Sequence, residues 1–331
     1  MEGIFGAWGR VLRGYNPLLS IELTRECPLR CPGCYAYGED HLGGEVTLRQ
    51  VRDLKGQELI DGVLGLIDQH KPLHVSIIGG EPLVRYRELS ELLPRMAALG
   101  IHTQLVTSAV RPIPLEWKSV PHLSLVVSID GLQPEHDQRR APATYERILK
   151  HIVGHHVTVH CTVTRQQAKR EGYLKEFVNF WSDQEAARRI WMSLYTPQIG
   201  EESEEKLTPQ DRQNVISELL ALKEHFPKLQ MTRGTIRAYD EPPSSPEECV
   251  FAKTTTCVSA DLKHPITPCQ FGGKPDCKNC GCMASAGLIS FKRYKLGGHV
   301  RLSPFLDASL QIGSMSRRIR ERFRAQPRED I

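Results

Sequence analysis

Short apolar runs rich in β-branched residues recur along the first two thirds of the chain and predict six strands. They lie at residues 19–24, 74–78, 103–107, 123–129, 157–163 and 189–195. Between these runs, apolar residues return every three or four positions, the period of a helix, at residues 47–69, 86–99, 142–153, 171–182 and 209–224. Apolar strands that alternate with helices indicate a parallel sheet whose faces are both covered. Six such units are fewer than the eight of a closed barrel, so we expect an α/β fold built as a partial (β/α)6 barrel.

A change in composition divides the chain. The barrel is expected over residues 19–240, after a short N-terminal extension at 1–18. A stretch rich in proline and serine, EPPSSPEE at 241–248, reads as a linker. We expect residues 241–331, which begin with this linker and are rich in cysteine, to form a small C-terminal extension.

Charge and hydropathy exclude several classes of protein. The chain has 43 basic and 39 acidic residues, and a net charge of +4 does not by itself indicate nucleic-acid binding. No apolar run is long enough for a membrane span, and the N-terminus lacks the pattern of a secretory signal, so we expect a cytoplasmic protein. The basic run at 317–330 fits a helix with solvated charges better than a patch for an acidic partner.

Nine of the ten cysteines fall in two clusters, and the tenth, Cys161, lies in a strand-like run where a buried small side chain is expected. In a chain of this size without a signal sequence, clustered cysteines indicate metal ligands rather than disulfides. The first cluster, Cys27-x3-Cys31-x2-Cys34, follows the first strand directly and is one thiol short of a closed four-ligand site.

Polar residues follow other strands at the same edge of the predicted sheet, where parallel α/β folds place their chemistry. Gly79-Gly80-Glu81 comes after the second strand, Ser108 after the third, and Ser128 with Asp130 at the end of the fourth. The glycines would let the backbone approach a ligand closely, and Glu81 would offer a carboxylate to a cationic group.

Together, the cysteine triplet, the GGEP segment at 79–82 and the SIDG segment at 128–131 resemble the radical S-adenosylmethionine (radical SAM) superfamily. The resemblance covers about residues 19–195. It implies that Cys27, Cys31 and Cys34 hold a 4Fe–4S cluster whose fourth iron is left for S-adenosylmethionine. A one-electron reductant such as flavodoxin or ferredoxin would then drive cleavage to a 5′-deoxyadenosyl radical, which abstracts a hydrogen atom from the substrate.

The resemblance also implies roles for the residues that bind S-adenosylmethionine. The segment Gly79, Gly80 and Glu81 would receive the methionine amino group. The strand-four residues Ser128 and Asp130 would contact the carboxylate or the ribose. Arg140 is similar to an arginine that pairs with the carboxylate, although Arg139 is as near in sequence, and Ser108 could bond the ribose.

Two positions depart from the family's pattern, and several motifs have a simpler interpretation. The residue before the third cysteine is commonly aromatic, and here it is Gly33; the Thr-Asn-Gly of relatives reads Thr-Ser-Ala at 107–109. The GGEP segment alone could be a turn, SIDG a helix cap, and the arginine pair a solvated basic patch. The histidines 151, 155, 156 and 160 fit ordinary packing and surface roles.

The second cluster holds six cysteines in 34 residues: Cys249, Cys257, Cys269, Cys277, Cys280 and Cys282. Their order resembles a shortened SPASM or twitch extension, which carries auxiliary clusters in radical SAM enzymes. Because no cysteine follows Cys282, we expect one auxiliary 4Fe–4S cluster, with Cys257 and Cys269 as its surest ligands. A structural zinc site is the alternative.

The resemblance leaves the substrate open between a peptide and a small molecule or lipid. Relatives with this extension often modify ribosomally made peptides, but 18 residues before the first strand are too few for the recognition domain that many of them carry. Relatives that oxidise a sulfatase side chain have Asp after the cysteine that matches Cys269, whereas this chain has Gln270. The catalytic acid or base is not identified.

Two other classes of function remain to be distinguished. A non-enzymatic zinc or iron–sulfur regulator would explain the cysteines, but not an open three-thiolate site beside GGEP. An activase that installs a glycyl radical would not need the second cluster. Cleavage of S-adenosylmethionine by a cluster on the first three cysteines would identify an enzyme and exclude the non-enzymatic regulator.

Overall fold

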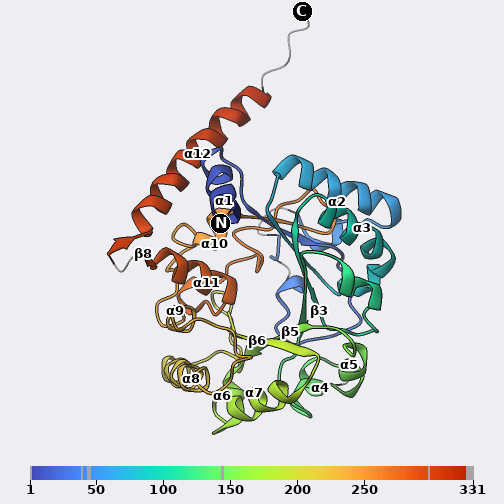
Figure 1. Ribbon diagram of the computed structural model, residues 1–331, viewed down its shortest axis with the longest axis vertical. Helices are drawn as coiled ribbons and strands as arrows, with labels where there is room; N and C mark the ends of the chain where they lie inside the picture. Colours follow the sequence, from blue (N-terminus) through green and yellow to red (C-terminus); the bar gives the residue numbers. More distant parts are fainter. Residues whose placement is uncertain (1, 39, 43–45, 143–144, 297–298, 326–331) are drawn as a thin grey trace, which may run out of the picture.

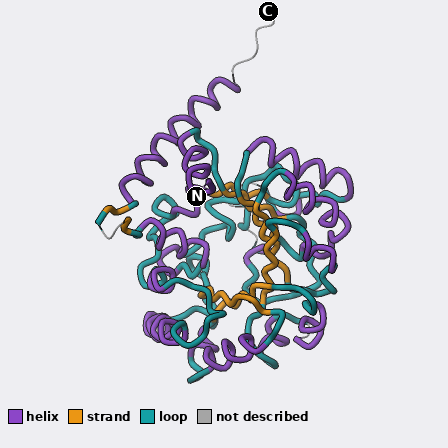
Figure 2. Tube along the Cα trace, viewed as in Figure 1, coloured by secondary structure: helices purple, strands orange, loops and turns teal. Residues whose placement is uncertain are grey.

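The computed structural model describes residues 2–38, 40–42, 46–142, 145–296 and 299–325. Seven strands form one parallel sheet in the order β6-β5-β4-β3-β2-β1-β7. Their bounds are β1 (Leu18–Glu22), β2 (His74–Ile78), β3 (His102–Thr107), β4 (Leu123–Ser128), β5 (Val157–Val163), β6 (Ala187–Leu194) and β7 (Thr255–Val258). The strands follow an arc, with helices along its outer side (Figure 2). The six predicted strands correspond to β1 through β6, and the α/β partial barrel is confirmed.

The seventh strand comes from the cysteine-rich extension. β7 pairs in parallel with β1, in a register that sets Cys257 beside Ser20. Four residues, three of them polar or cysteine, give no long apolar run, which is why the sequence pattern did not predict this strand. The sheet therefore continues across the expected boundary at residue 240.

Helices cover the outer face of the sheet (Figure 1). They are α2 (Gly56–His70), α3 (Tyr86–Ala98), α4 (Glu135–Arg139), α5 (Tyr145–His151), α6 (Arg165–Ala168), α7 (Tyr173–Asp183) and α8 (Pro209–Leu222). The helix expected at 47–69 begins only at Gly56. Thr47 caps a single 3-10 turn, and the chain is extended at Val51 and Lys55 before α2 starts. Residues 143–144 of another expected helix lie outside the described residues.

Alternation along the strands separates the core from an inner surface. The side chains in the core are fully buried and apolar, as with Ile77 in β2 and Cys161 in β5, and they pack among the helices. The intervening positions line the inner side of the arc and are often polar, as with Gln104 in β3 and Thr162 in β5. The expectation that Cys161 is a buried core residue is confirmed.

The remaining elements close the other side of the molecule. They are α1 (Glu2–Leu12), α9 (Arg233–Arg237), α10 (Val250–Thr254), α11 (Met283–Lys292), β8 (Lys295–Leu296), β9 (Val300–Arg301) and α12 (Ser303–Ala325). The two end helices pack together: Trp8 Nε1 donates to Ser309 Oγ at 2.7 Å (Figure 1). α12 contains the start of the basic run, and residues 326–330 of that run lie outside the described part. Within the described part, no helix is long and apolar enough to span a bilayer.

Candidate functional site

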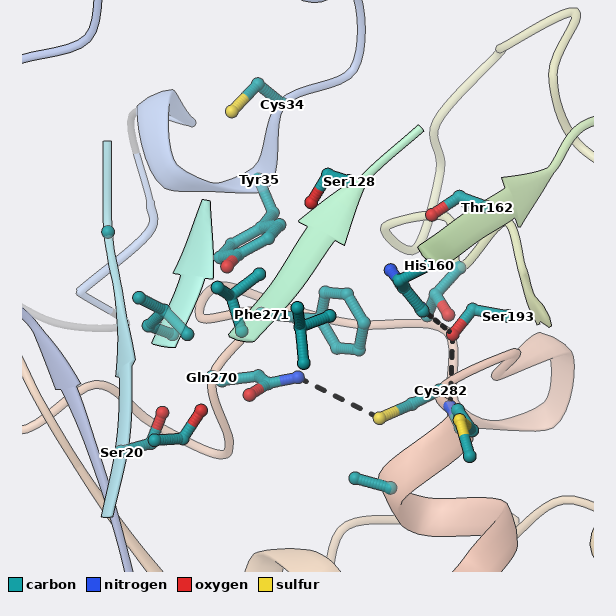
Figure 3. Close-up of a pocket in the computed structure, with 18 of the residues that line it drawn as sticks. Ser20, Cys34, Tyr35, Ser128, His160, Thr162, Ser193, Gln270, Phe271 and Cys282 are labelled. Atoms are coloured by element: carbon teal, nitrogen blue, oxygen red, sulfur yellow. Dashed lines mark hydrogen bonds between the residues drawn. The ribbon is translucent and has the colours of Figure 1, made fainter. Parts of the chain in front are cut away.

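The inner side of the arc holds a cavity of about 590 Å³. Predicted site residues from both cysteine clusters and from three strand ends line it: Cys27, Cys31, Cys34, Gly79, Gly80, Ser108, Ser128, Arg140 and Cys282. Figure 3 shows Cys34 at one end of this space and Cys282 at the other, with Tyr35 and Phe271 between them. Glu81, Asp130 and the other C-terminal cysteines do not form part of this lining.

The three N-terminal cysteines lie on one loop after β1, close enough to influence one another. Burial raises the pKa of Cys27 to about 11, and Glu81, Cys31 and Cys34 contribute to the increase. Burial also raises the pKa of Cys31, while the guanidinium of Arg140 acts in the opposite direction. Among the described residues, no three His, Cys, Asp or Glu side chains converge as they would around a single metal ion. The loop does present three thiols and a nearby cation to the same cavity, and this donor set suits an iron–sulfur cluster.

The glycines after β2 allow two main-chain segments to approach closely. Gly80 N donates to Thr24 O at 2.7 Å, and Glu81 N donates to Glu26 O at 2.9 Å. A Cβ at Gly79, whose φ is +129°, would lie 2.6 Å from Thr24 O, and one at Gly80 would lie 2.5 Å from Glu26 O. The two glycines are therefore required for packing against the start of the cysteine loop.

The Glu81 carboxylate is used within the protein. It is fully buried and accepts from Leu83 N at 2.9 Å, Thr107 Oγ1 at 2.5 Å and Ser108 N at 2.7 Å. Burial raises the pKa of Glu81, and these three donors oppose that increase. Glu81 thus joins the ends of β2 and β3, and its direct contact with a cofactor stays a prediction.

Asp130 organises the two arginines at the end of β4. Its side chain is buried and accepts from Arg140 Nε at 2.7 Å, from Arg139 Nη1 and from Thr162 N at 3.1 Å. Burial alone would raise the pKa of Asp130, but Arg140 and Arg139 outweigh it and hold the pKa far below its usual range. Arg140 Nη1 also donates to Ser108 Oγ at 2.9 Å. Three predicted residues, Ser108, Asp130 and Arg140, therefore form one network.

Gly33 leaves room for Tyr195. Its φ is +61°, and a Cβ there would lie 2.7 Å from Tyr195 Oη. Tyr195 follows β6, and its hydroxyl donates to Glu201 in the acidic loop at 196–209. At the position that is commonly aromatic, the Tyr195 side chain thus occupies the space that a side chain on residue 33 would need.

His41 joins the first cysteine loop to the C-terminal extension. Its Nε2 lies 2.8 Å from Glu22 Oε1, and both side chains are almost fully buried. Its Nδ1 lies 3.3 Å from Phe271 O, and its own carbonyl accepts from Gly273 N. A Cβ at Gly272 would lie 1.8 Å from His41 O, so the segment after Cys269 packs directly on this loop.

The C-terminal cysteines gather in one region. The charges of Cys280, Cys269 and Cys249 raise the pKa of Cys282, and those of Cys257, Cys280 and Cys249 raise the pKa of Cys269. Burial raises the pKa of Cys269, Cys280 and Cys282 first, and the neighbouring thiols raise it further.

The remaining two C-terminal thiols lie at the edge of this group. Cys257, on β7, belongs to a small apolar cluster with Leu42, Val51 and Ile266, although its thiol influences those of Cys269 and Cys282. The charges that act on Cys277 include those of Cys280 and Cys249. The chain turns back after Cys257, since Ile266 N donates to Cys257 O at 2.9 Å.

The opposite end of the cavity holds residues that the motif analysis missed. His160 Nε2 lies 2.7 Å from Ser193 Oγ, which also accepts from Met283 N at 3.3 Å (Figure 3). Gln270 Nε2 approaches Cys282 Sγ at 3.9 Å. Burial lowers the pKa of His160 to about 4. His151 and His155 bond backbone carbonyls, as expected for packing residues, whereas His160 faces the cavity.

Comparisons with known proteins agree on the class of the domain. Residues 21–153 match the model of the Radical SAM superfamily. PqqA peptide cyclase of Rhizobium meliloti (strain 1021) is 34% identical over 123 residues, which are 36% of this chain and 30% of that protein. PqqA peptide cyclase of Methylobacterium sp. (strain 4-46) is 36% identical over 93 residues, 28% of this chain and 22% of that protein. The matches thus span less than a third of these relatives' length.

Two solved structures share the fold at low sequence identity. Streptococcus suis SuiB bound to the precursor peptide SuiA superposes with a TM-score of 0.59 and 16% identity, over 94% of this chain and 74% of that one. The enzyme anSMEcpe with bound AdoMet superposes with a TM-score of 0.55 and 16% identity, over 88% of this chain and 84% of that one. At this identity the likeness extends to the architecture only.

Proposed function

We propose that the protein, whose residues 21–153 match the Radical SAM superfamily, is a radical SAM enzyme that modifies a peptide side chain. The observation that carries the proposal is the shared cavity. It is lined by the three cysteines after β1, by the glycines after β2 and by Cys282 of the C-terminal extension. One space thus brings the predicted cofactor residues within reach of a substrate.

A 4Fe–4S cluster and S-adenosylmethionine are the cofactors of this superfamily, and the residues present fit them. Cys27, Cys31 and Cys34 would hold the cluster. The segment at 79–80, with Ser108, Ser128 and Arg140, would hold S-adenosylmethionine, and Asp130 would orient Arg140. Together the bound cofactors supply hydrogen-atom abstraction from an unactivated carbon.

The chain's own residues hold the cavity in shape for this chemistry. Asp130 fixes Arg140 toward Ser108, so a cationic and a hydroxyl group lie on the cavity wall. Tyr35 and Phe271 pack edge to face between the two cysteine regions, with their ring centroids 5.3 Å apart. His160 and Ser193 provide hydrogen-bonding groups at the far end, where a substrate side chain would lie.

A peptide substrate is supported by the named relatives. The curated matches are peptide cyclases, and SuiB was solved with a precursor peptide. The proposal includes an auxiliary 4Fe–4S cluster on Cys249, Cys269, Cys280 and Cys282, because the first three lie near enough to Cys282 for their charges to raise its pKa. Cys257 and Cys277 would lie beside it, so of the two surest ligands expected from the sequence only Cys269 is retained. A flavodoxin or ferredoxin would supply the electron.

The test is anaerobic reconstitution with iron and sulfide, reduction with dithionite, and measurement of 5′-deoxyadenosine formed from S-adenosylmethionine. The control is the Cys27/Cys31/Cys34→Ala triple variant, which should form none. Product in the wild type alone supports the enzyme. A fully loaded wild type that forms no product, or a purified protein that holds zinc, would favour the regulatory alternative.

A further inference from the structure

Arg212 is a buried cation that reaches the cysteine-rich extension from the barrel. It lies in the first turn of α8, and its residue exposure is 7%. Its Nη2 donates to Asn279 O at 2.6 Å, and its Nη1 donates to Cys280 O at 3.1 Å and Tyr239 O at 2.9 Å. The guanidinium thus fixes the main chain between Cys277 and Cys282.

The same segment is fixed from its other side by β6. Leu194 N donates to Gly281 O at 2.9 Å, and Gly281 N donates to Thr196 Oγ1 at 2.9 Å. A Cβ at Gly281 would lie 2.1 Å from Leu194 O, so the contact leaves no space for another residue. Two barrel elements, α8 and β6, therefore set the position of the Cys280–Cys282 run.

The hydrogen bonds of Arg212 leave its charge unbalanced. All three acceptors are carbonyl oxygens, and across the described residues no carboxylate comes within ion-pair distance of it. The partly buried Arg139 and Arg140, by contrast, each pair with Asp130. A buried cation without an anionic partner is costly. Burial lowers the pKa of Arg212, and the group that opposes this most is the thiol of Cys280, followed by Tyr239, Asp276 and Asp240.

We propose that Arg212 is the buried counter-charge and positioning residue of the auxiliary cluster. The inference rests on the proposed function, which supplies that cluster. Four thiolates around an oxidised 4Fe–4S core carry a net charge of about −2, and one-electron reduction makes it about −3. A cation held beside the ligands stabilises the more negative state, so Arg212 raises the reduction potential. It also holds the loop from which Cys280 and Cys282 project.

The experiment uses the full chain with Cys27, Cys31 and Cys34 changed to Ala, reconstituted so that only auxiliary iron remains. Reduced cluster is measured by electron paramagnetic resonance in an anaerobic redox titration. Arg212→Gln removes the charge but keeps amide donors, whereas Arg212→Lys keeps the charge. Arg233→Gln is the matched control, since Arg233 is half-exposed and pairs with Glu224 at the surface.

Arg212→Gln should lower the ratio of reduced to oxidised cluster about tenfold at a fixed potential, equivalent to about 59 mV for a one-electron couple. Arg212→Lys should stay within about threefold of the parent, and Arg233→Gln should match it. If circular dichroism shows that Arg212→Gln does not fold, the test uses Arg212→Lys and a second measurement, the rate at which a chelator removes iron. Arg212→Lys should then lose iron faster than Arg233→Gln, because lysine cannot bind all three carbonyl oxygens. An unchanged ratio in folded Arg212→Gln, or an unchanged rate of iron loss in Arg212→Lys where only that variant folds, overturns the inference alone. A parent that retains no iron overturns the auxiliary cluster and the inference together.

Discussion

Arg139 binds both carboxylate oxygens of Glu205, with Nε and Nη2 at 2.7 and 2.8 Å, although 66 residues separate the two in sequence. Arg139 also binds the buried Asp130. The acidic loop after β6 is therefore attached to the network that positions Arg140. Breaking the Arg139–Glu205 pair should therefore weaken both the attachment of the acidic loop and the network around Asp130.

Glu205→Gln should lower the free energy of unfolding by about 1.5–3 kcal/mol, the usual value of hydrogen bonds to a charged group. It should also speed tryptic cleavage at Lys206. Urea unfolding and limited proteolysis check this, with the exposed neighbour Glu204→Gln as control. Equal stability and equal cleavage in the two variants would show that the contact does not hold the loop.

Gly33→Ala should damage the first cluster site, because an alanine there needs a positive φ and meets the Tyr195 hydroxyl. We expect a loss of about 1–3 kcal/mol in stability and less iron per chain after reconstitution. Tyr195→Phe should restore part of the iron content in the double variant, since it removes the contacting oxygen. Normal iron content in Gly33→Ala would contradict the packing described.

Stability should decrease as the pH falls from about 6.5 to about 4. Asp130 N donates to His136 Nδ1 at 3.1 Å, so this nitrogen carries no proton, and burial lowers the pKa of His136 to about 4. An unfolded histidine titrates near pH 6.5. Between these values the unfolded chain binds a proton that the folded chain lacks, and stability changes by about 1.4 kcal/mol per pH unit for each such histidine.

Urea unfolding of the reduced, cluster-free chain at several pH values checks this dependence. His136→Asn keeps an acceptor oxygen but does not titrate, so it should show a shallower decline than the wild type. Since His160 has a similarly lowered pKa, part of the decline should remain. A steeper decline in His136→Asn would mean that the sign is wrong.

Single cysteine variants should separate the auxiliary ligands from their neighbours. In the triple-alanine background, Cys269→Ala, Cys280→Ala and Cys282→Ala should each retain less than half of the remaining iron, because each removes a proposed ligand of the auxiliary cluster. Cys161→Ala, in the core of the sheet, is the matched control and should retain all of it. Full retention in Cys269→Ala would exclude the proposed ligand set.

The strands and the first cysteine loop were predictable because their signals are local. Apolar runs mark β1 through β6, and the spacing of three thiols lies within eight residues. The inward position of His160 was also predictable from the sequence, because neighbouring residues of β5 point to opposite faces of the sheet and Cys161 points into the core. Its role was missed because no motif contains it.

Other parts of the site depend on distant contacts that no local pattern contains. Tyr195 beside Gly33, Glu205 beside Arg139 and Arg212 beside Cys280 each join segments at least 66 residues apart. Glu81 shows how far a local motif reaches. Its motif was found, but the three donors that surround its carboxylate become visible only when β2 and β3 are placed side by side.

Because β7 pairs with β1, the cysteine-rich extension covers what would otherwise be an edge strand of the barrel sheet. Without it, β1 would present unpaired N–H and C=O groups beside apolar side chains, which is a template for association between molecules. Damage to the extension, for example by oxygen, would then leave a chain that is prone to aggregate. A barrel cut out at residue 240 should therefore precipitate, even though every residue of the first cluster site would still be present.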